Sequence, residues 1–240
     1  MEKYIYFFIL AFVAEVIGTI SGFGSSILFV PLASMFFDFK AVLAITAVFH
    51  VFSNLSKIYL FKTGIQKDIV LKLGIPAVVF VIIGALLTNI IPQKEIELVM
   101  NIVLFLLSVF LIFNTEEKLE QSNKNLIVGG VSSGFLAGLV GTGGAIRGLV
   151  LAAFSLEKDS FLATSALIDL GVDFSRAIVY ISSGYFLKEF LIFIPFLILI
   201  SIAGSYIGKL VLNKMPQKYF RNIVLIVIVS ISIYSISKYF

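Results

Sequence analysis

Two glycine-rich stretches interrupt the longest apolar runs of the sequence, which cover residues 4–37 and 126–156. An interior glycine costs a helix about 1 kcal/mol relative to alanine, so a plain helix gains nothing from them. A chain that turns at glycines bares its backbone N–H groups, and a helix that restarts there directs its anion-attracting N-terminus at the same point. This predicts an anion site at two facing turns, lined by Gly22, Gly24, Ser25, Gly141, Gly143 and Gly144.

An arginine follows the second glycine-rich stretch without leaving the apolar run. We expect helices to restart at Ile27 and Ile146, which places Arg147 in the first turn of the second helix. Because an arginine at bilayer depth costs about 2.5 kcal/mol or more, its presence indicates a role. One role is a charge-assisted contact to an oxyanion. The alternatives are that it reaches an interface or pairs with a carboxylate such as Glu15.

Ionisable side chains occupy one face of a later apolar segment. Asp169, Asp173 and Arg176 are spaced i, i+4 and i+7, which places them on the same helical face. The corresponding face of an earlier segment carries three further polar residues, His50, Asn54 and Lys57. Ionisable residues within membrane spans usually face a polar interior or a pathway, so we expect both faces to border the anion site.

These charged residues divide by expected role. Lys57 and Arg176 would contact the anion and raise the positive potential of the site. A titratable group beside the anion site would couple transport to protons. Histidine changes charge nearest neutral pH, and a carboxylate can be protonated. The candidates are His50, Asp169, Asp173 and, with less support, Glu15. The alternative for the face with Asp169, Asp173 and Arg176 is a neutral structural pair between Asp173 and Arg176, which leaves Asp169 without a partner.

The segments that position these residues form an internal duplication. At an offset of 119 residues Gly22 falls on Gly141, and Asn54 falls on Asp173. A shared apolar composition would not align so many polar and special residues. We therefore divide the chain into a first repeat at residues 1–114, a polar linker at 115–125 and a second repeat at 126–240, with the two repeats packed as one transmembrane domain.

The composition excludes a water-soluble globule. Of 240 residues, 60% are hydrophobic and only 13% are charged, which is too few polar groups to cover a soluble surface. Because the chain has no Cys and a single His, we expect no metal site and no cofactor. The net charge of +4 comes from basic residues in short loops between apolar runs, a feature of membrane topology rather than of nucleic-acid binding.

The hydrophobic pattern predicts an all-α polytopic membrane protein of eight segments, four in each repeat, with the first segment of each repeat broken at its glycines. The segments lie at about residues 4–37, 41–61, 69–91, 95–114, 126–156, 160–182, 188–212 and 219–238. If each broken segment is one tilted span, the chain crosses eight times and the repeats are parallel. If each folds back into a re-entrant hairpin, the repeats are inverted.

The charges in the loops favour the hairpin geometry. With single tilted spans, eight of the fifteen loop Lys and Arg residues would lie on one side of the membrane and seven on the other, with Lys3, Lys124 and Lys188 on the same side. Hairpins divide them ten to five, with the larger group at Lys62 to Lys72, Lys118, Lys124, Lys158 and Lys209 to Arg221. Only the second division clearly obeys the positive-inside rule, so we expect inverted repeats with both termini outside.

Two further glycine patterns have simpler explanations. Gly130, Gly134 and Gly138 form a GxxxGxxxG ridge and Gly204 with Gly208 a shorter one, and we expect both to serve close helix packing. The first five residues of the longer ridge also match the GxSxG expression of hydrolases, but that motif requires a strand-to-helix turn in an α/β sheet. The sequence supports no set of nucleophile, base and orienting group, so we expect a protein that is not an enzyme.

The chain resembles the TauE/SafE family of sulfite and organosulfonate exporters. The resemblance lies in a glycine-rich core that opens each repeat and in a small-residue start of the following segment, at Gly22 to Ser26 with Val30 and Pro31, at Gly141 to Ala145, and at Ala163 to Ser165. It covers nearly the whole chain. It implies two repeats of four hydrophobic segments and the transport of small sulfur-containing anions, driven by an ion gradient.

These observations predict a multi-pass secondary transporter of the cell membrane for a small anion, with sulfite, thiosulfate or a sulfonate as the substrate class. The alternatives are a passive anion channel and a membrane protein that serves a partner protein without transporting. The expected partners are the anionic substrate and the lipid bilayer, and not nucleic acid. A homo-oligomer is compatible with the sequence.

Overall fold

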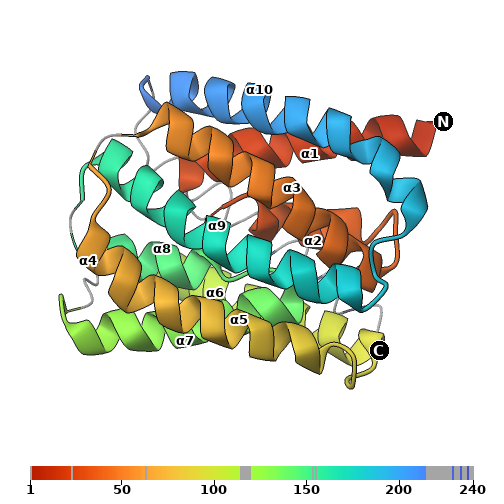
Figure 1. Ribbon diagram of the computed structural model, residues 1–240, viewed down its shortest axis with the longest axis horizontal. Helices are drawn as coiled ribbons and strands as arrows, with labels where there is room; N and C mark the ends of the chain where they lie inside the picture. Colours follow the sequence, from red (N-terminus) through yellow and green to blue (C-terminus); the bar gives the residue numbers. More distant parts are fainter. Residues whose placement is uncertain are drawn as a thin grey trace.

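The computed structural model describes residues 2–22, 24–62, 64–113, 120–152, 154, 156–214, 229, 233 and 237. Every regular element in these ranges is a helix, as predicted (Figure 1). In chain order the elements are α1 (Glu2–Ser21), α2 (Ser26–Ala33), α3 (Phe39–Leu60), α4 (Lys67–Ile69), η1 (Val70–Gly74), α5 (Ile75–Leu87), α6 (Gln93–Phe113), α7 (Asn123–Val140), α8 (Gly144–Ala152), α9 (Lys158–Ser182), η2 (Lys188–Phe193) and α10 (Ile194–Leu212).

Two predicted parts of the chain fall largely outside these ranges. The predicted eighth segment, residues 219–238, lies outside the described residues except at positions 229, 233 and 237. Residues 115–119 of the predicted linker, with Lys118, also lie outside them. All of the predicted site residues lie within the described ranges.

The described helices have the surface of a membrane protein. Four stretches are long and apolar enough to cross a membrane, at Glu2–Ser21, Phe39–Leu60, Lys67–Leu87 and Lys188–Leu212. Large apolar side chains are exposed along them, including Ile75 and Val79 on α5 and Leu199 and Ile202 on α10. Water-soluble proteins rarely expose contiguous apolar surface of this extent, whereas lipid tails solvate it.

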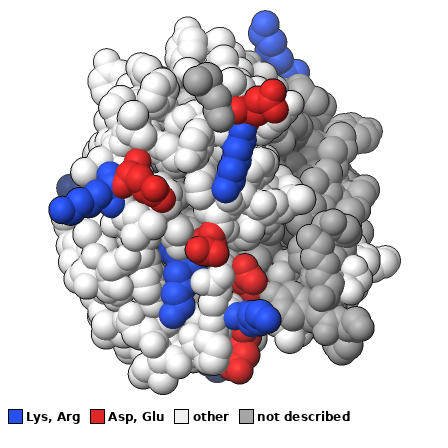
Figure 2. Space-filling model, turned by 90° about the vertical axis from the view of Figure 1, so that its right-hand side faces the viewer, with Lys and Arg blue, Asp and Glu red and all other residues white. Residues whose placement is uncertain are grey.

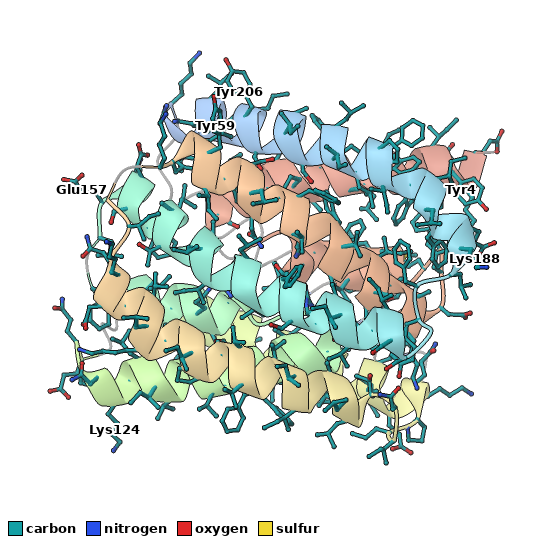
Figure 3. All side chains as sticks on the ribbon, viewed as in Figure 1. Tyr4, Tyr59, Lys124, Glu157, Lys188 and Tyr206 are labelled. Atoms are coloured by element: carbon teal, nitrogen blue, oxygen red, sulfur yellow. The ribbon has the colours of Figure 1, made fainter. Side chains whose placement is uncertain are left out.

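Charged and tyrosine side chains mark the ends of the helices. Figure 2 looks onto the right-hand end of Figure 1 and shows Lys, Arg, Asp and Glu side chains on that face. Figure 3 places Tyr4 and Lys188 at this end, and Tyr59, Lys124 and Glu157 at the opposite end. Charged residues and tyrosines gather where a bilayer meets water, so both ends of the molecule carry side chains typical of a membrane surface.

The chain turns sharply between α1 and α2. α1 ends at Ser21 and α2 begins at Ser26. Gly22 and Gly24, between them, have φ angles of +75° and +80°, which glycine adopts without the steric penalty of other residues. The turn also passes so close to α1 that a Cβ on Gly18 would lie 2.5 Å from the Cα of Ser25. The close approach therefore requires glycine at position 18, and the backbone angles of the turn favour glycine at positions 22 and 24.

After the turn, α2 runs back beside α1. The ring centroids of Phe7 on α1 and Phe29 on α2 are 5.5 Å apart. The rings of Tyr4 and Phe37 are stacked with their centroids 6.3 Å apart. These contacts place the two ends of the first apolar run, residues 4–37, at the same end of the molecule.

A second turn separates α7 from α8. α7 ends at Val140 and α8 begins at Gly144, with Gly141 in the left-handed region at φ +82°. α2 and α8 begin one and two residues before the predicted starts at Ile27 and Ile146, because serine and glycine also adopt helical backbone angles. The first N–H groups of α8 have no partner within the helix and face the turn.

The glycine ridge of α7 packs directly against the backbone of α5. A Cβ on Gly134 would lie 2.6 Å from the Cα of Ala77, and a Cβ on Gly138 would lie 2.6 Å from the backbone nitrogen of Ala85. Such distances leave no room for any side chain. The packing role predicted for this ridge is confirmed. The shorter ridge of α10 also packs closely, but against side chains of α1, with Gly204 at Glu15 and Gly208 at Thr19.

The close approach of α5 and α7 can be tested by adding a methyl group. We expect Gly134→Ala to lower the free energy of unfolding by about 1–3 kcal/mol, because overpacking forces the two backbones apart. Thermal unfolding in detergent measures the change. Gly74→Ala is the matched control, since its Cβ would lie 3.4 Å from Cγ1 of Ile168, an ordinary contact. Equal melting temperatures for the two variants would contradict the close approach.

Candidate functional site

The two polar faces predicted from the sequence lie against each other on α3 and α9. The helices run side by side through the middle of the molecule (Figure 1). Asn54 Nδ2 on α3 donates a hydrogen bond of 2.7 Å to Asp173 Oδ2 on α9. The two residues are 119 positions apart, which is the offset of the predicted duplication. Equivalent residues that touch each other lie on the axis that would relate the two copies.

A cavity of about 30 Å³ lies between these faces and the two glycine turns. Every predicted site residue except Glu15 lines it, namely Gly22, Gly24, Ser25, His50, Lys57, Gly141, Gly143, Gly144, Arg147, Asp169, Asp173 and Arg176. A space of this size holds about two water molecules. The structure therefore brings residues from both predicted repeats together around one small cavity.

Arg147 is buried and pairs with Asp169. Its Nη1 forms the ion pair with Asp169 Oδ1, and its Nε donates a hydrogen bond of 3.1 Å to Ser165 Oγ. The predicted alternative of a pair with a carboxylate is present, but the partner is Asp169 and not the suggested Glu15. The expectation that Asp169 would have no partner was wrong. Arg147 on α8 faces α9, whereas Glu15 lies on α1, and the order of the chain does not reveal which helices pack together.

Arg176 joins its neighbour Asp173 to the second glycine turn. Arg176 Nη2 lies 2.7 Å from Asp173 Oδ1, so the predicted neutral pair is present. Arg176 Nη1 also donates to the backbone carbonyls of Ala137 and Gly141, at 3.0 and 2.8 Å. These carbonyls belong to the C-terminal end of α7, where a cation is favoured by the helix dipole. Arg176 therefore holds the turn in place as well as lining the cavity.

Glu15 lies behind the cavity in a shell of donors. Its carboxylate is completely buried, and Lys57 Nζ lies 2.8 Å from Oε1. Three serines also donate to it: Ser25 at 2.8 Å, and Ser53 and Ser205 at 2.7 Å each. Sequence reasoning missed Ser53 and Ser205. Ser53 was detectable, because it stands one helical turn before Lys57; Ser205 gave no signal, because it comes from a distant part of the chain.

His50 connects the two groups of charges. Its Nε2 lies 2.9 Å from Ser25 Oγ, and its Nδ1 lies 3.9 Å from Asp173 Oδ2. Ser25 has a single proton, which its hydroxyl donates to Glu15. Nε2 of His50 must then donate to Ser25, since two acceptors cannot bond each other. A line of polar groups thus runs from Glu15 on α1 to Asp173 on α9.

The positive charges of the site carry their own counter-ions. Lys57, Arg147 and Arg176 are each within ion-pair distance of a carboxylate, from Glu15, Asp169 and Asp173 respectively. The expected surplus of positive charge at the site is thus balanced inside the protein. Among the described residues there is no group of three or more His, Cys, Asp or Glu side chains placed to hold a metal ion.

Comparison with protein families extends the sequence resemblance. A family model described as "Sulfite exporter TauE/SafE" matches residues 7–235, which is nearly the whole chain and includes both glycine turns and every residue of the cavity. No curated protein and no solved structure matches the chain.

Proposed function

Because the chain belongs to the TauE/SafE sulfite exporter family, we propose that it is a multi-pass secondary transporter of the cell membrane for a small sulfur oxyanion or organosulfonate. The observation that carries the proposal is the cavity, where Arg147 meets both glycine turns. The planar guanidinium fork fits two oxygens of an oxyanion. The N-termini of α2 and α8 supply further N–H groups at the same place.

Substrate binding has to displace a carboxylate. The cavity of about 30 Å³ admits about two water molecules, and Arg147 is already paired with Asp169. A sulfur oxyanion would therefore replace Asp169 on Arg147 and widen the cavity. Asp169 is the carboxylate best placed to leave, because its side chain is 17% exposed, against 5% for Asp173 and 0% for Glu15.

The arrangement of the helices supports inverted repeats. The stacking of Tyr4 on Phe37 returns the first apolar run to its starting end, as a re-entrant hairpin requires. Single tilted spans would place Tyr4, Lys124 and Lys188 at one end, and Figure 3 has Lys124 at the opposite end from the other two. The contact between Asn54 and Asp173 is the contact expected on an axis between the copies. We propose on these grounds that the repeats are inverted, with the N-terminus outside.

Proton coupling is proposed for the line of groups through His50. In the neutral ring Nε2 donates to Ser25, so Nδ1 has no proton to offer Asp173 at 3.9 Å. A second proton on the ring would make Nδ1 a donor toward Asp173. The groups that face His50 are Glu15 and Lys57 on one side, and Asp173 and Arg176 on the other. Protonation of His50 would thus link Asp173, beside the cavity, to Glu15 behind it.

The role of His50 can be separated from substrate binding. We expect His50→Asn to abolish the stimulation of sulfite flux by an imposed pH gradient, because the ring that connects Ser25 to Asp173 is lost. Exchange of sulfite for sulfite at equal pH on both sides needs no net proton movement, so it should persist in the variant. Flux assays in proteoliposomes measure both. If the variant keeps the full response to the pH gradient, His50 has no part in coupling.

The proposed function itself is tested by reconstitution. Purified protein in proteoliposomes should move radiolabelled sulfite with saturable kinetics and, under an imposed pH gradient, should accumulate it against its own gradient. A passive channel only equilibrates its ion, and a membrane protein that serves a partner moves none. A thermal-shift screen of sulfite, thiosulfate, sulfonates, sulfate and carboxylates identifies the substrate class, since a ligand that prefers the folded state raises the melting temperature.

A further inference from the structure

The Lys57 ammonium lies in an oxygen cage that is built around Glu15. Nζ of Lys57 is 2.8 Å from Glu15 Oε1 and 2.8 Å from Ser53 Oγ. Ser53 and Ser205 also donate to Oε1, and Ser25 donates to Oε2, so the carboxylate and hydroxyls form one connected cluster. The cluster joins α1, α3, α10 and the first glycine turn. A cation at the position of Nζ is bound by a carboxylate oxygen and a hydroxyl oxygen.

Carboxylate and hydroxyl oxygens are the ligands that hard cations prefer. An ammonium group is itself a compact cation on a flexible stem, so it can stand where a free monovalent ion would otherwise be bound. We propose that Glu15 and its serines form a monovalent-cation site, and that this chain fills the site with its own Lys57. Removal of the Lys57 side chain would then leave a site for Na⁺.

The second half of the molecule shows that the cage is a specific construction. At the offset of 119, Glu15 corresponds to Gly134 and Ser53 corresponds to Val172, so neither ligand of the ammonium is repeated. Arg176 corresponds to Lys57, but it donates to the backbone carbonyls that end α7. Arg176 on α9 therefore donates to the carbonyls at a helix end, whereas Lys57 on α3 pairs with a buried carboxylate.

The test uses the full-length protein in detergent and the variant Lys57→Ala. At constant ionic strength, with N-methylglucamine as the non-binding replacement cation, we expect Na⁺ to raise the melting temperature of Lys57→Ala by about 5 °C at about 100 times its Kd. The wild type should show no such rise, because its site is filled. The double variant Lys57→Ala/Glu15→Gln should also show none, because the carboxylate that binds the ion is gone.

Lys72→Ala is the matched control for the loss of a lysine. Lys72 pairs with Asp68 at 2.7 Å on the exposed surface, so its removal should create no response to Na⁺. The proposal is overturned if Lys57→Ala is folded and melts at the same temperature with and without Na⁺. It is overturned as well if Lys57→Ala and Lys57→Ser both fail to fold in Na⁺, Li⁺ and K⁺, since a free ion must be able to replace the ammonium.

The consequence for transport rests on the proposed function. If the chain carries its own cation, sulfite flux by the wild type is indifferent to a Na⁺ gradient, and flux by Lys57→Ala becomes dependent on Na⁺. The melting experiment reports on the cage alone and stands whether or not sulfite is the substrate. A Na⁺-dependent melting temperature without any sulfite flux would therefore separate a failure of the proposed function from a failure of the cation site.

Discussion

Replacing Arg147 with leucine is expected to weaken sulfite binding by about 10- to 100-fold, because a hydrogen bond to a charged group contributes about 1.5–3 kcal/mol. Leucine is a suitable replacement, since Leu28 stands at the corresponding position of the first half. Isothermal titration or a thermal-shift titration of the purified variant measures the affinity. Transport should fall with the affinity, because Arg176, the other described arginine at the cavity, is held by the carbonyls of the second glycine turn.

The same substitution also affects folding, and a second variant separates the two effects. Arg147→Leu leaves Asp169 without its cation, which destabilises a buried site. Arg147→Leu/Asp169→Leu removes both charges, and replacing a whole buried pair with apolar residues is often neutral. We expect the double variant to regain thermal stability but not sulfite binding. Wild-type affinity in either folded variant would remove Arg147 from the site.

Replacing Arg176 with methionine is expected to lower the free energy of unfolding by about 3–5 kcal/mol, the usual effect of removing one partner of a buried ion pair. The loss has two physical sources. Asp173 keeps a buried charge without its cation, and the carbonyls of Ala137 and Gly141 lose their donor at the second glycine turn. Unfolding in detergent by heat or by denaturant measures the change.

Lys72→Met is the control for this second prediction. Its ion pair with Asp68 is exposed and should contribute less than about 1 kcal/mol. Both substitutions remove a cation 2.7 Å from a carboxylate. The difference between the two losses of stability therefore measures the effect of burial. Equal losses of stability in the two variants would show that Arg176 does not hold the turn.

The composition of the site was predictable because two simple periodicities determine it. Helical spacing placed Asp169, Asp173 and Arg176 on one face, and the offset of 119 connected that face to His50 and Lys57. The cavity in the structure is lined by all five of these residues. Their roles in binding and coupling stay predictions until the variants are measured.

The pairing of the charges was not predictable in the same way. Which carboxylate meets Arg147 depends on the packing of α8 against α9, and hydrophobic patterns do not contain that distance. Ser205 reaches Glu15 from 190 residues away, and nothing in its local sequence distinguishes it from a packing residue. Pairs within one helix, such as Asp173 with Arg176, follow from spacing; pairs between helices require the fold.

Under the proposed transport function, the backbone contact between α5 and α7 limits how the protein can move. These two helices come from opposite halves of the sequence, and at Gly134 and Gly138 no side chain separates them. Rotation of one half of the molecule against the other would have to separate the backbones of these two helices. Under the proposed transport function, a change of access at the cavity would therefore fall to the short helices α2 and α8, which begin at the cavity, while α5 and α7 stay packed together.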